Sequence, residues 1–478
     1  MRTVRLAFKS VCPCRASVEK SKLLSVKEIP EIRILTVILI GLMLCTAQLG
    51  RAVEMPQEWP LLGKERDADA IKRVLSGASG IASAAWWGFD AEDSTQFFQS
   101  AIDSGAKTVL VPYMGKPWVV RPIHLRSNQT LLFEPGVVVL AKRGEFKGKG
   151  DSLFSAADKK NIVLRGYGAR FIMHKEDYQS EAYEKAEWRM GVNLRGCSRV
   201  RIEGMRIEKT GGDGIYLGAG RKPYCKDIVI RDVQCVDNHR QGISVIGAEN
   251  LLIENCTLSG TRGAPPQAGI DFEPNETANR LVNCVMRDCV IEENIGREIL
   301  VFLGPLSSKT VPLSIHVENC LLRGGKGPGI EVAGLRDNGP KGTIEFNNCT
   351  IEHTEAAGIY VWEKSADRAR LRFLNCRCSD VGLKTGGSGK VKQERPVPIL
   401  LAPSNVKSVK RGGGIDFVNC SVYDTVDRPA LVLDDNGTSL GVHDLTGVLA
   451  VYNLNGARME TRCKTSKMQL DVEGHFSR

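Results

Sequence analysis

Several features that would assign this 478-residue chain to a common class are missing. The apolar run at residues 34–45 has twelve residues, fewer than the roughly 20 that a membrane-spanning helix needs. No C-x-x-C pair is matched by a second cysteine cluster, so structural zinc is not expected. Residues 1–52 hold nine Lys or Arg against three Glu, which leaves +4 of the +10 net charge for the rest. Without a polybasic stripe, nucleic acid is not expected as a partner.

The apolar run fits the central region of a secretory signal peptide. Arg33 precedes it, and small residues follow, so that cleavage after Ala47 or Ala52 is expected. We expect residues 1–52 to be a signal peptide with an over-long basic n-region, and the true start to lie in the twenties. The protein is then secreted, periplasmic or at the cell surface, with no stable membrane insertion after cleavage. An uncleaved anchor is the alternative.

What the sequence does contain is a repeat. A β-branched run and Asn-Cys lead to Gly-Ile and another apolar pair, as in Ile253 to Cys256 followed by Gly269-Ile270. The isoleucines at 215, 243, 270, 299, 330 and 359 are 28, 27, 29, 31 and 29 residues apart. An irregular period in the high twenties with two or three short strands is typical of a coiled parallel β-solenoid.

The fifteen cysteines do not show a disulfide pattern. The cysteines that directly follow an asparagine fall at what looks like one phase of the coils, which predicts an inward-facing stack of free thiols. Those cysteines are Cys256, Cys284, Cys320, Cys349, Cys376 and Cys420.

Residues 86–140 resemble the opening of the pectate-lyase-like β-helix superfamily. They contain Gly88, spaced aspartates, Ser94-Thr95, an amphipathic run at 97–102, a strand ending in Pro112 and a Ser-Asn turn at 127–128. The resemblance implies an all-β, right-handed parallel β-helix with an N-terminal capping helix. We expect the cap and first coils at 55–140, the β-helix at 141–440, and a C-terminal tail or cap at 441–478.

Alignment of the coils on the repeated isoleucine brings polar residues of neighbouring coils together. Stacked strands lie about 4.8 Å apart, so Tyr216, Ser244 and Asp271 are expected in one outward-facing row. Glu273 shares the strand and the face of Asp271, with about 7 Å between their Cβ atoms. The residues expected to converge on one surface strip are Asp213, His239, Arg240, Asp271 and Glu273.

A pair of carboxylates on a sugar-binding face is the minimum for glycoside hydrolysis. We expect Asp271 and Glu273 to be the acid/base pair, Asp213 an assisting carboxylate, and His239 and Arg240 substrate-orienting groups. In a hydrolase the pair should be open to solvent, in a groove walled by residues 173–190 and 260–267. The partner is a polysaccharide or oligosaccharide, and no cofactor or metal is expected.

The loop at residues 173–190 is rich in aromatic and basic residues. Trp188 and Arg189 lie there, and with Tyr216 on the strand they are candidate substrate-binding residues. Packing of this loop against the side of the coils is the alternative for these residues.

Two other functions remain open. Asp271 and Glu273 could bind Ca²⁺ in a uronide lyase or epimerase, with Arg240 as the base, although arginine resists deprotonation. The chain could also be a non-catalytic carbohydrate-binding or surface solenoid, whose carboxylates would be satisfied by backbone donors.

The coil around Asp213 also resembles polygalacturonases. Gly212-Asp213-Gly214 lies where their Gly-Asp-Asp would be, and His239 to Ser244 is similar to their histidine-containing coil. The second aspartate of the first motif is Gly214 here, and neither Asn-Thr-Asp nor Arg-Ile-Lys occurs at the right coils. The resemblance therefore implies the superfamily and a carbohydrate substrate, but not the polygalacturonase mechanism.

Overall fold

The computed structural model describes residues 62–476, apart from 385–396, 403–408, 436, 439 and 454–457. The predicted signal peptide at 1–52 lies outside the described residues. Among those that are described, no helix has the length and apolarity needed to cross a membrane.

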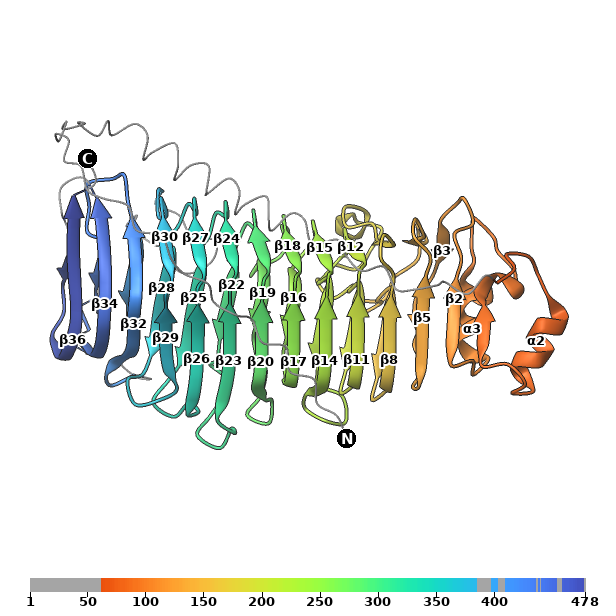
Figure 1. Cartoon of the computed structure of the whole chain (residues 1–478), viewed down its shortest axis with the longest axis horizontal. Helices are drawn as coiled ribbons and strands as arrows, with labels where there is room; N and C mark the ends of the chain where they lie inside the picture. Colours follow the sequence, from red (N-terminus) through yellow and green to blue (C-terminus); the bar gives the residue numbers. More distant parts are fainter. Residues whose placement is uncertain are drawn as a thin grey trace, which may run out of the picture. The chain divides into compact units, whose positions relative to one another are not determined.

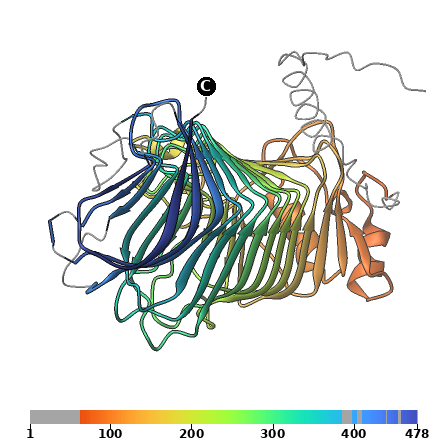
Figure 2. The same ribbon diagram turned by 60° about the vertical axis from the view of Figure 1, so that its left-hand side comes forward.

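The described chain winds into stacked coils, and Figure 1 shows their strands side by side along the long axis. A complete coil carries three strands: two belong to a 24-stranded parallel sheet and one to a 12-stranded parallel sheet. Figure 2 shows the strands of successive coils stacked in register. The predicted period in the high twenties and the all-β parallel solenoid are therefore confirmed.

The strands of the 12-stranded sheet carry the candidate site. They are β4 (Ile123–His124), β7 (Phe154–Ala157), β10 (Val192–Arg195), β13 (Ile215–Gly218), β16 (Gln241–Val245), β19 (Ala268–Phe272), β22 (Ile299–Phe302), β25 (Ile330–Leu335), β28 (Ile359–Lys364), β31 (Ile399–Ala402), β33 (Leu431–Leu433) and β35 (Met459–Thr461).

The other sheet covers the remaining sides of each coil. Its strands are β1 (Ile81–Ser83), β2 (Thr108–Val111), β3 (Trp118–Val120), β5 (Gln129–Phe133), β6 (Val138–Ala141), β8 (Lys160–Arg165), β9 (Arg170–Ile172), β11 (Ser198–Glu203), β12 (Arg206–Glu208), β14 (Cys225–Arg231), β15 (Gln234–Val236), β17 (Ala248–Glu254), β18 (Thr257–Ser259), β20 (Leu281–Arg287), β21 (Val290–Glu292), β23 (Leu313–Glu318), β24 (Leu321–Arg323), β26 (Gly342–Asn347), β27 (Thr350–Glu352), β29 (Arg370–Leu374), β30 (Arg377–Ser379), β32 (Gly412–Tyr423), β34 (Val442–Asn453) and β36 (Thr465–Phe476).

Among the described residues, two α-helices precede the first full coils: α2 (Ala68–Leu75) and α3 (Thr95–Asp103). Asp67 caps α2 by accepting a hydrogen bond from the Ala70 amide. The buried side of α3 includes Phe98, whose ring lies 5.6 Å from that of Trp118 and 6.3 Å from that of Phe133. The amphipathic run predicted to cap the helix thus packs against the apolar side chains of the first coils.

The repeated isoleucines form one inward row. Ile215 pairs with Ile243, Ile243 with Ile270, and Ile270 with Ile299, and all four are fully buried. Since neighbours in a strand point to opposite faces, this row directs the next residue of each strand to the outside. The predicted inward isoleucine phase is confirmed.

The asparagine of the repeated Asn-Cys pair is explained by the local backbone conformation. The asparagines before the stacked cysteines, such as Asn255 and Asn319, have positive φ values of 52° and 55°, a backbone conformation that asparagine tolerates well. Their amides bond along the stack, as when Asn348 Nδ2 donates to Asn319 Oδ1 at 2.9 Å. The turn then directs the following cysteine inward.

The predicted thiol stack exists, with one member corrected. Cys284 pairs with Leu251 and Ile315 in mid-strand, so it lies at a different phase from Cys256. Cys289 takes its place, because the Cys256 amide donates to Cys289 Sγ at 3.4 Å. Asp288, at φ 55°, provides the same left-handed turn as an asparagine. All of these thiols are free and buried.

The coils extend past the boundary predicted at residue 440. β34 pairs in parallel with β32 on one side and β36 on the other, and β35 pairs with β33. β34, β35 and β36 therefore continue the two sheets, where a separate tail was one of the two expectations.

Candidate functional site

The outer face of the 12-stranded sheet carries the predicted row. Tyr216 on β13 pairs with Ser244 on β16, Ser244 with Asp271 on β19, and Asp271 with Leu300 on β22. This order confirms the outward row expected from the alternation of side chains. Glu273 continues β19 beyond its last residue, because its amide donates to the Val245 carbonyl at 3.2 Å.

Arg240, just before β16, is the centre of the site. Its Nη2 lies 3.2 Å from Glu273 Oε2, its Nε lies 3.3 Å from Glu187 Oε2, and its Nη1 lies 3.8 Å from Asp213 Oδ1. The guanidinium side chain is 15% exposed. One arginine therefore holds three carboxylates from three segments of the chain at short range, and it brings Asp213 and Glu273 to one place as the sequence predicts.

Asp271 lies beside this cluster and is completely buried. Gln241 Nε2 donates a hydrogen bond to its Oδ2, while Gln241 Oε1 accepts from Arg240 Nη1 at 2.6 Å and from the Ser244 hydroxyl. Burial raises the pKa of Asp271 well above its usual value, and the Glu273 carboxylate raises it further. Both effects favour the protonated form of Asp271.

Asp213 precedes β13 and is also completely buried. Neither carboxylate oxygen has a hydrogen-bond partner of normal geometry. Burial raises the pKa of this group to about 6, against the opposing charge of Arg240. A buried acid with a pKa near neutrality and an incomplete set of partners is typical of functional sites.

Glu273 is the carboxylate that reaches solvent, with 29% of its side chain exposed. The expectation that both members of the pair are open in a groove is therefore wrong for Asp271. The side chains of Gln241 and Ser244 lie against Asp271, and the two carboxyls form an exposed and a buried partner.

His239 lies beside the strip, under the 260–267 loop. It is 8% exposed, and its carbonyl accepts a hydrogen bond from the Ala264 amide at 2.9 Å. A side chain on Gly263 would collide with the His239 ring, since a Cβ there would lie 2.0 Å from Nδ1. Burial lowers the pKa of His239 to about 4, with a further contribution from Lys175, so the ring is neutral at pH 7.

The two residues of the 173–190 loop that were predicted to contact sugar differ in their exposure to solvent. Trp188 is 46% exposed, whereas Arg189 is fully buried. Arg189 Nε donates to the Phe146 carbonyl at 2.8 Å and its Nη2 to the Glu184 carbonyl at 2.9 Å. The prediction that Arg189 binds substrate is wrong, because its guanidinium holds the loop against the coils.

Tyr216 is 9% exposed and belongs to the row without being open to solvent. The Arg195 guanidinium lies over its ring at 5.0 Å from the centroid, and Met190 and Ile246 pack beside it. Two residues of the site were not predicted: Glu187 in the loop and Gln241 on β16. Ser244 was expected in the outward-facing row, but without a role in the site.

The positive charge beside the carboxylates of the strip is the Arg240 guanidinium. Among the described residues, no group of three or more His, Cys, Asp or Glu side chains is arranged to hold a metal ion.

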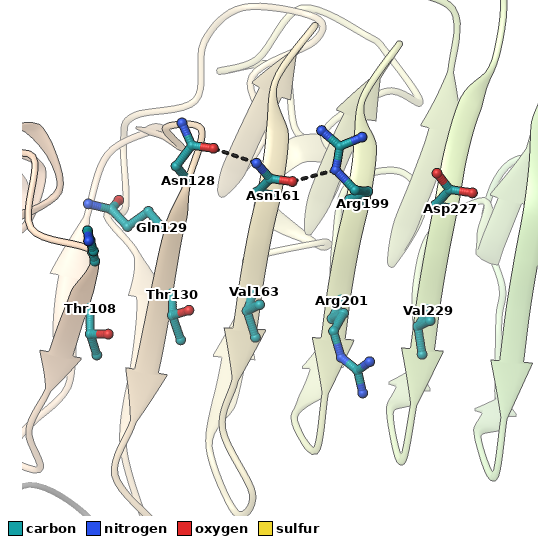
Figure 3. A pocket seen from close by; sticks show the side chains of 11 residues that line it. Thr108, Asn128, Gln129, Thr130, Asn161, Val163, Arg199, Arg201, Asp227 and Val229 are labelled. Atoms are coloured by element: carbon teal, nitrogen blue, oxygen red, sulfur yellow. Dashed lines mark hydrogen bonds between the residues drawn. The ribbon is translucent and has the colours of Figure 1, made fainter.

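A groove of about 580 Å³ lies elsewhere, over the outer face of the 24-stranded sheet (Figure 3). Asn128, Asn161 and Arg199 cross it as a ladder, in which Arg199 Nε donates to Asn161 Oδ1. These residues have φ values of 61°, 56° and 53°, so the ladder marks the same left-handed turn in successive coils. Asp227 is the single carboxylate among its lining residues, and the groove lacks the carboxylate pair that hydrolysis needs.

The comparisons with known proteins agree with the fold. The sequence profile of the family described as "Right handed beta helix region" matches residues 183–378. The chain is a right-handed parallel β-helix. The right-handed parallel β-helix fold that the resemblance implied is confirmed.

The β-helix has sequence relatives and structural neighbours. It is 28% identical over 163 residues to the SPbeta prophage-derived uncharacterized protein YorA of Bacillus subtilis, covering 32% of this chain and 28% of that protein. It spans about a third or less of the length of the curated relatives that it matches.

Two solved structures share the fold at low identity. The Yersinia enterocolitica family 28 exopolygalacturonase has a TM-score of 0.57 at 13% identity, over 83% of this chain and 79% of that one. The A-module of the Azotobacter vinelandii mannuronan C-5 epimerase AlgE6 has a TM-score of 0.56 at 15% identity, over 82% of this chain and 100% of that one.

Proposed function

We propose that this β-helix is a polysaccharide-active enzyme, a glycoside hydrolase whose site is the strip around Arg240. The observation that carries the proposal is the pair of unlike carboxyls on β19. Asp271 is buried, which raises its pKa and favours its protonated form, while Glu273 reaches solvent and is paired with Arg240. Two carboxyls whose environments separate their protonation states are what acid/base hydrolysis of a glycosidic bond needs.

The geometry assigns a role to each group. Glu273 touches the substrate, and Asp271 supplies the proton that passes through Glu273 to the leaving glycosidic oxygen. The bond from the anomeric carbon to that oxygen breaks, and the hydroxyl of a water molecule adds to the carbon. The proton that this water loses returns through Glu273 to the Asp271 carboxylate, which restores the starting state. Gln241 and Arg240 stabilise the negative charge left on Asp271, and Asp213 is the assisting carboxylate.

The similar folds support the class of substrate. One belongs to an exopolygalacturonase and the other to a mannuronan C-5 epimerase, each named for a polysaccharide. Because Gly214 replaces the second aspartate of the polygalacturonase motif, the support does not extend to that mechanism. We also propose that the enzyme acts outside the cytoplasm, which the predicted signal peptide supports.

The charge of the strip favours a neutral polysaccharide. Glu187, Glu273 and Asp213 surround the single positive charge of Arg240, so the strip is net negative above the pKa of Asp213. A polyuronide would be repelled there at neutral pH. This makes the Ca²⁺-dependent uronide lyase or epimerase the second candidate, supported by the fold of the epimerase module.

The complete burial of Asp213 and Asp271 favours the third candidate, a non-catalytic carbohydrate-binding solenoid. That candidate and hydrolysis make different predictions for the β19 pair. A non-catalytic binder should retain its sugar affinity when Asp271 and Glu273 are replaced by neutral residues. Neither the parent chain nor the variants should then release any product.

The test is product release from a panel of plant and marine polysaccharides by the full chain and two isosteric variants. Asp271→Asn and Glu273→Gln should each lower the rate of reducing-end release by at least 100-fold, because general acid catalysis alone contributes on that order. The matched control is Glu254→Gln on the other sheet, where Glu254 bridges Arg231 and Arg287, and it should retain the parent rate.

Full activity in both β19 variants would remove the hydrolase assignment from this site. Product formation that a chelator abolishes, with an unsaturated uronide at the new end, would favour the lyase. Binding without any product from the parent chain would establish the non-catalytic solenoid.

A further inference from the structure

The row that contains Glu273 continues with aromatic side chains. The register pairs Asp271 with Leu300, so Glu273 lies opposite Phe302 one coil further along. Phe302 pairs with Ala333 on β25, and Ala333 pairs with Trp362 on β28. Glu273, Phe302, Ala333 and Trp362 therefore form a single row on the outer face of the 12-stranded sheet.

The two rings lean together over the small residue between them. Their centroids are 6.1 Å apart with an interplanar angle of 38°, although two coils separate the strands by about 9.6 Å. Ala333 leaves the space that this approach requires. Gly304 and Gly334 leave more, since a Cβ at Gly304 would lie 2.8 Å from the Phe302 ring and one at Gly334 would lie 3.1 Å from it.

Trp362 is anchored by its edge. Its Nε1 donates a hydrogen bond to Glu331 Oε1 at 2.8 Å, and Glu331 Oε2 accepts from Arg297 Nε at 2.6 Å. Glu331 is 2% exposed, so a buried, paired carboxylate fixes the indole while Trp362 and Phe302 stay partly exposed. An indole held in this way presents an apolar face while its N–H group keeps its hydrogen bond.

We propose that Phe302 and Trp362 form a sugar-stacking subsite that continues the Glu273 site toward the C-terminal coils. This inference rests on the proposed function, because it assigns a direction to the same substrate. Its ligand is a neutral pyranose polymer whose apolar C–H faces pack on the rings and whose chain runs along the axis of the β-helix. Pockets of this kind combine aromatic walls with a few fixed polar groups.

The spacing sets the length of the ligand. Glu273 and Trp362 are three coils apart, about 14 Å along the axis. A monosaccharide cannot touch both, so a ligand that bridges Glu273 and Trp362 is an oligosaccharide or a polymer.

The test measures affinity separately from cleavage. In the Glu273→Gln background, binding of soluble neutral polysaccharides from the panel is measured by affinity electrophoresis or calorimetry. Trp362→Ala and Phe302→Ala are each expected to weaken binding about tenfold, which corresponds to about 1.4 kcal/mol. Trp362→Phe keeps an aromatic face and should retain most of the affinity. Tyr113→Ala is the control, since Tyr113 is 46% exposed and lies in the N-terminal segment after β2.

Unchanged affinity in Trp362→Ala and Phe302→Ala would overturn the subsite even if cleavage at Glu273 is established. Absence of binding to every neutral polymer would overturn it as well. Conversely, a parent chain that binds but never cleaves, with binding lost in the two alanine variants, would support the subsite while refuting hydrolysis. If an alanine variant unfolds at a lower temperature, Trp362→Phe and Phe302→Leu decide, with retained affinity expected in the first and reduced affinity in the second.

Discussion

Asp213→Asn is expected to stabilise the β-helix at pH 8 and to leave its stability almost unchanged at pH 4. In the folded chain the pKa of Asp213 is raised from its ordinary 3.8 to about 6. The folded state therefore binds the proton more tightly than the unfolded chain, and the associated stability is lost as pH rises from about 4 through 6. An asparagine of the same shape carries no charge and escapes this loss.

The magnitude follows from the pKa difference. A tenfold change in acidity corresponds to about 1.4 kcal/mol, so the ionised buried group costs about 3 kcal/mol above pH 6. The pKa of about 6 already includes the attraction between Asp213 and Arg240, and Arg240 retains Glu187 and Glu273 as partners in the variant. A gain of 1–3 kcal/mol is expected.

The assay is urea unfolding of the parent and the variant at several pH values from 4 to 8, compared as a difference curve. The difference isolates Asp213 from His239, whose lowered pKa acts in the opposite direction. Asp69→Asn is the control, since Asp69 lies on the exposed side of α2, and should give a flat difference curve. A variant that is less stable than the parent at pH 8 would show that the Asp213 charge is stabilised by contacts, which contradicts this description of the site.

Two further outcomes are expected. Arg240→Met should lower the free energy of unfolding by about 3 kcal/mol at pH 8, because it leaves the buried Asp213 carboxylate without its cation. Arg240→Lys should not restore this stability, since one ammonium cannot reach three carboxylates. Unchanged midpoints in urea unfolding would contradict the central role of Arg240. Thiol labelling should modify Cys256, Cys289 and Cys349 only after the protein is denatured, because all three are buried and free. Mass spectrometry identifies the labelled residues. Disulfide-linked peptides from the stack would contradict the free-thiol stack.

The rows of the fold could be predicted because they depend on period and alternation. Ile215, Ile243 and Ile270 set the phase, and the position of Asp271 in the outward row follows from it. The position of a cysteine in its coil was predicted less well where the prediction depended on the type of the preceding residue. Asn283 precedes Cys284 as Asn255 precedes Cys256, but Asp288 makes the turn that places Cys289 in the stack. Aspartate and asparagine share the tolerance of positive φ that matters there.

The burial of the site could not be predicted, because it depends on side chains from other coils and loops. Trp188 and Arg189 are neighbours in a loop without periodicity, and one is exposed while the other is fully buried. The long side chain of Arg240 spans coils to reach Asp213 and Glu273, which no spacing in the sequence encodes. The aromatic row had a signal, since Phe302 and Trp362 occupy equivalent positions after Ile299 and Ile359.

Hydrolysis at the Glu273 site is tested most directly by product analysis in H₂¹⁸O. Mass spectrometry of oligosaccharides released from a neutral polysaccharide should show one ¹⁸O at each new reducing end, and Glu273→Gln should release none. Products that carry an unsaturated uronide and no ¹⁸O, or ¹⁸O-labelled products formed equally by Glu273→Gln, would contradict the proposal.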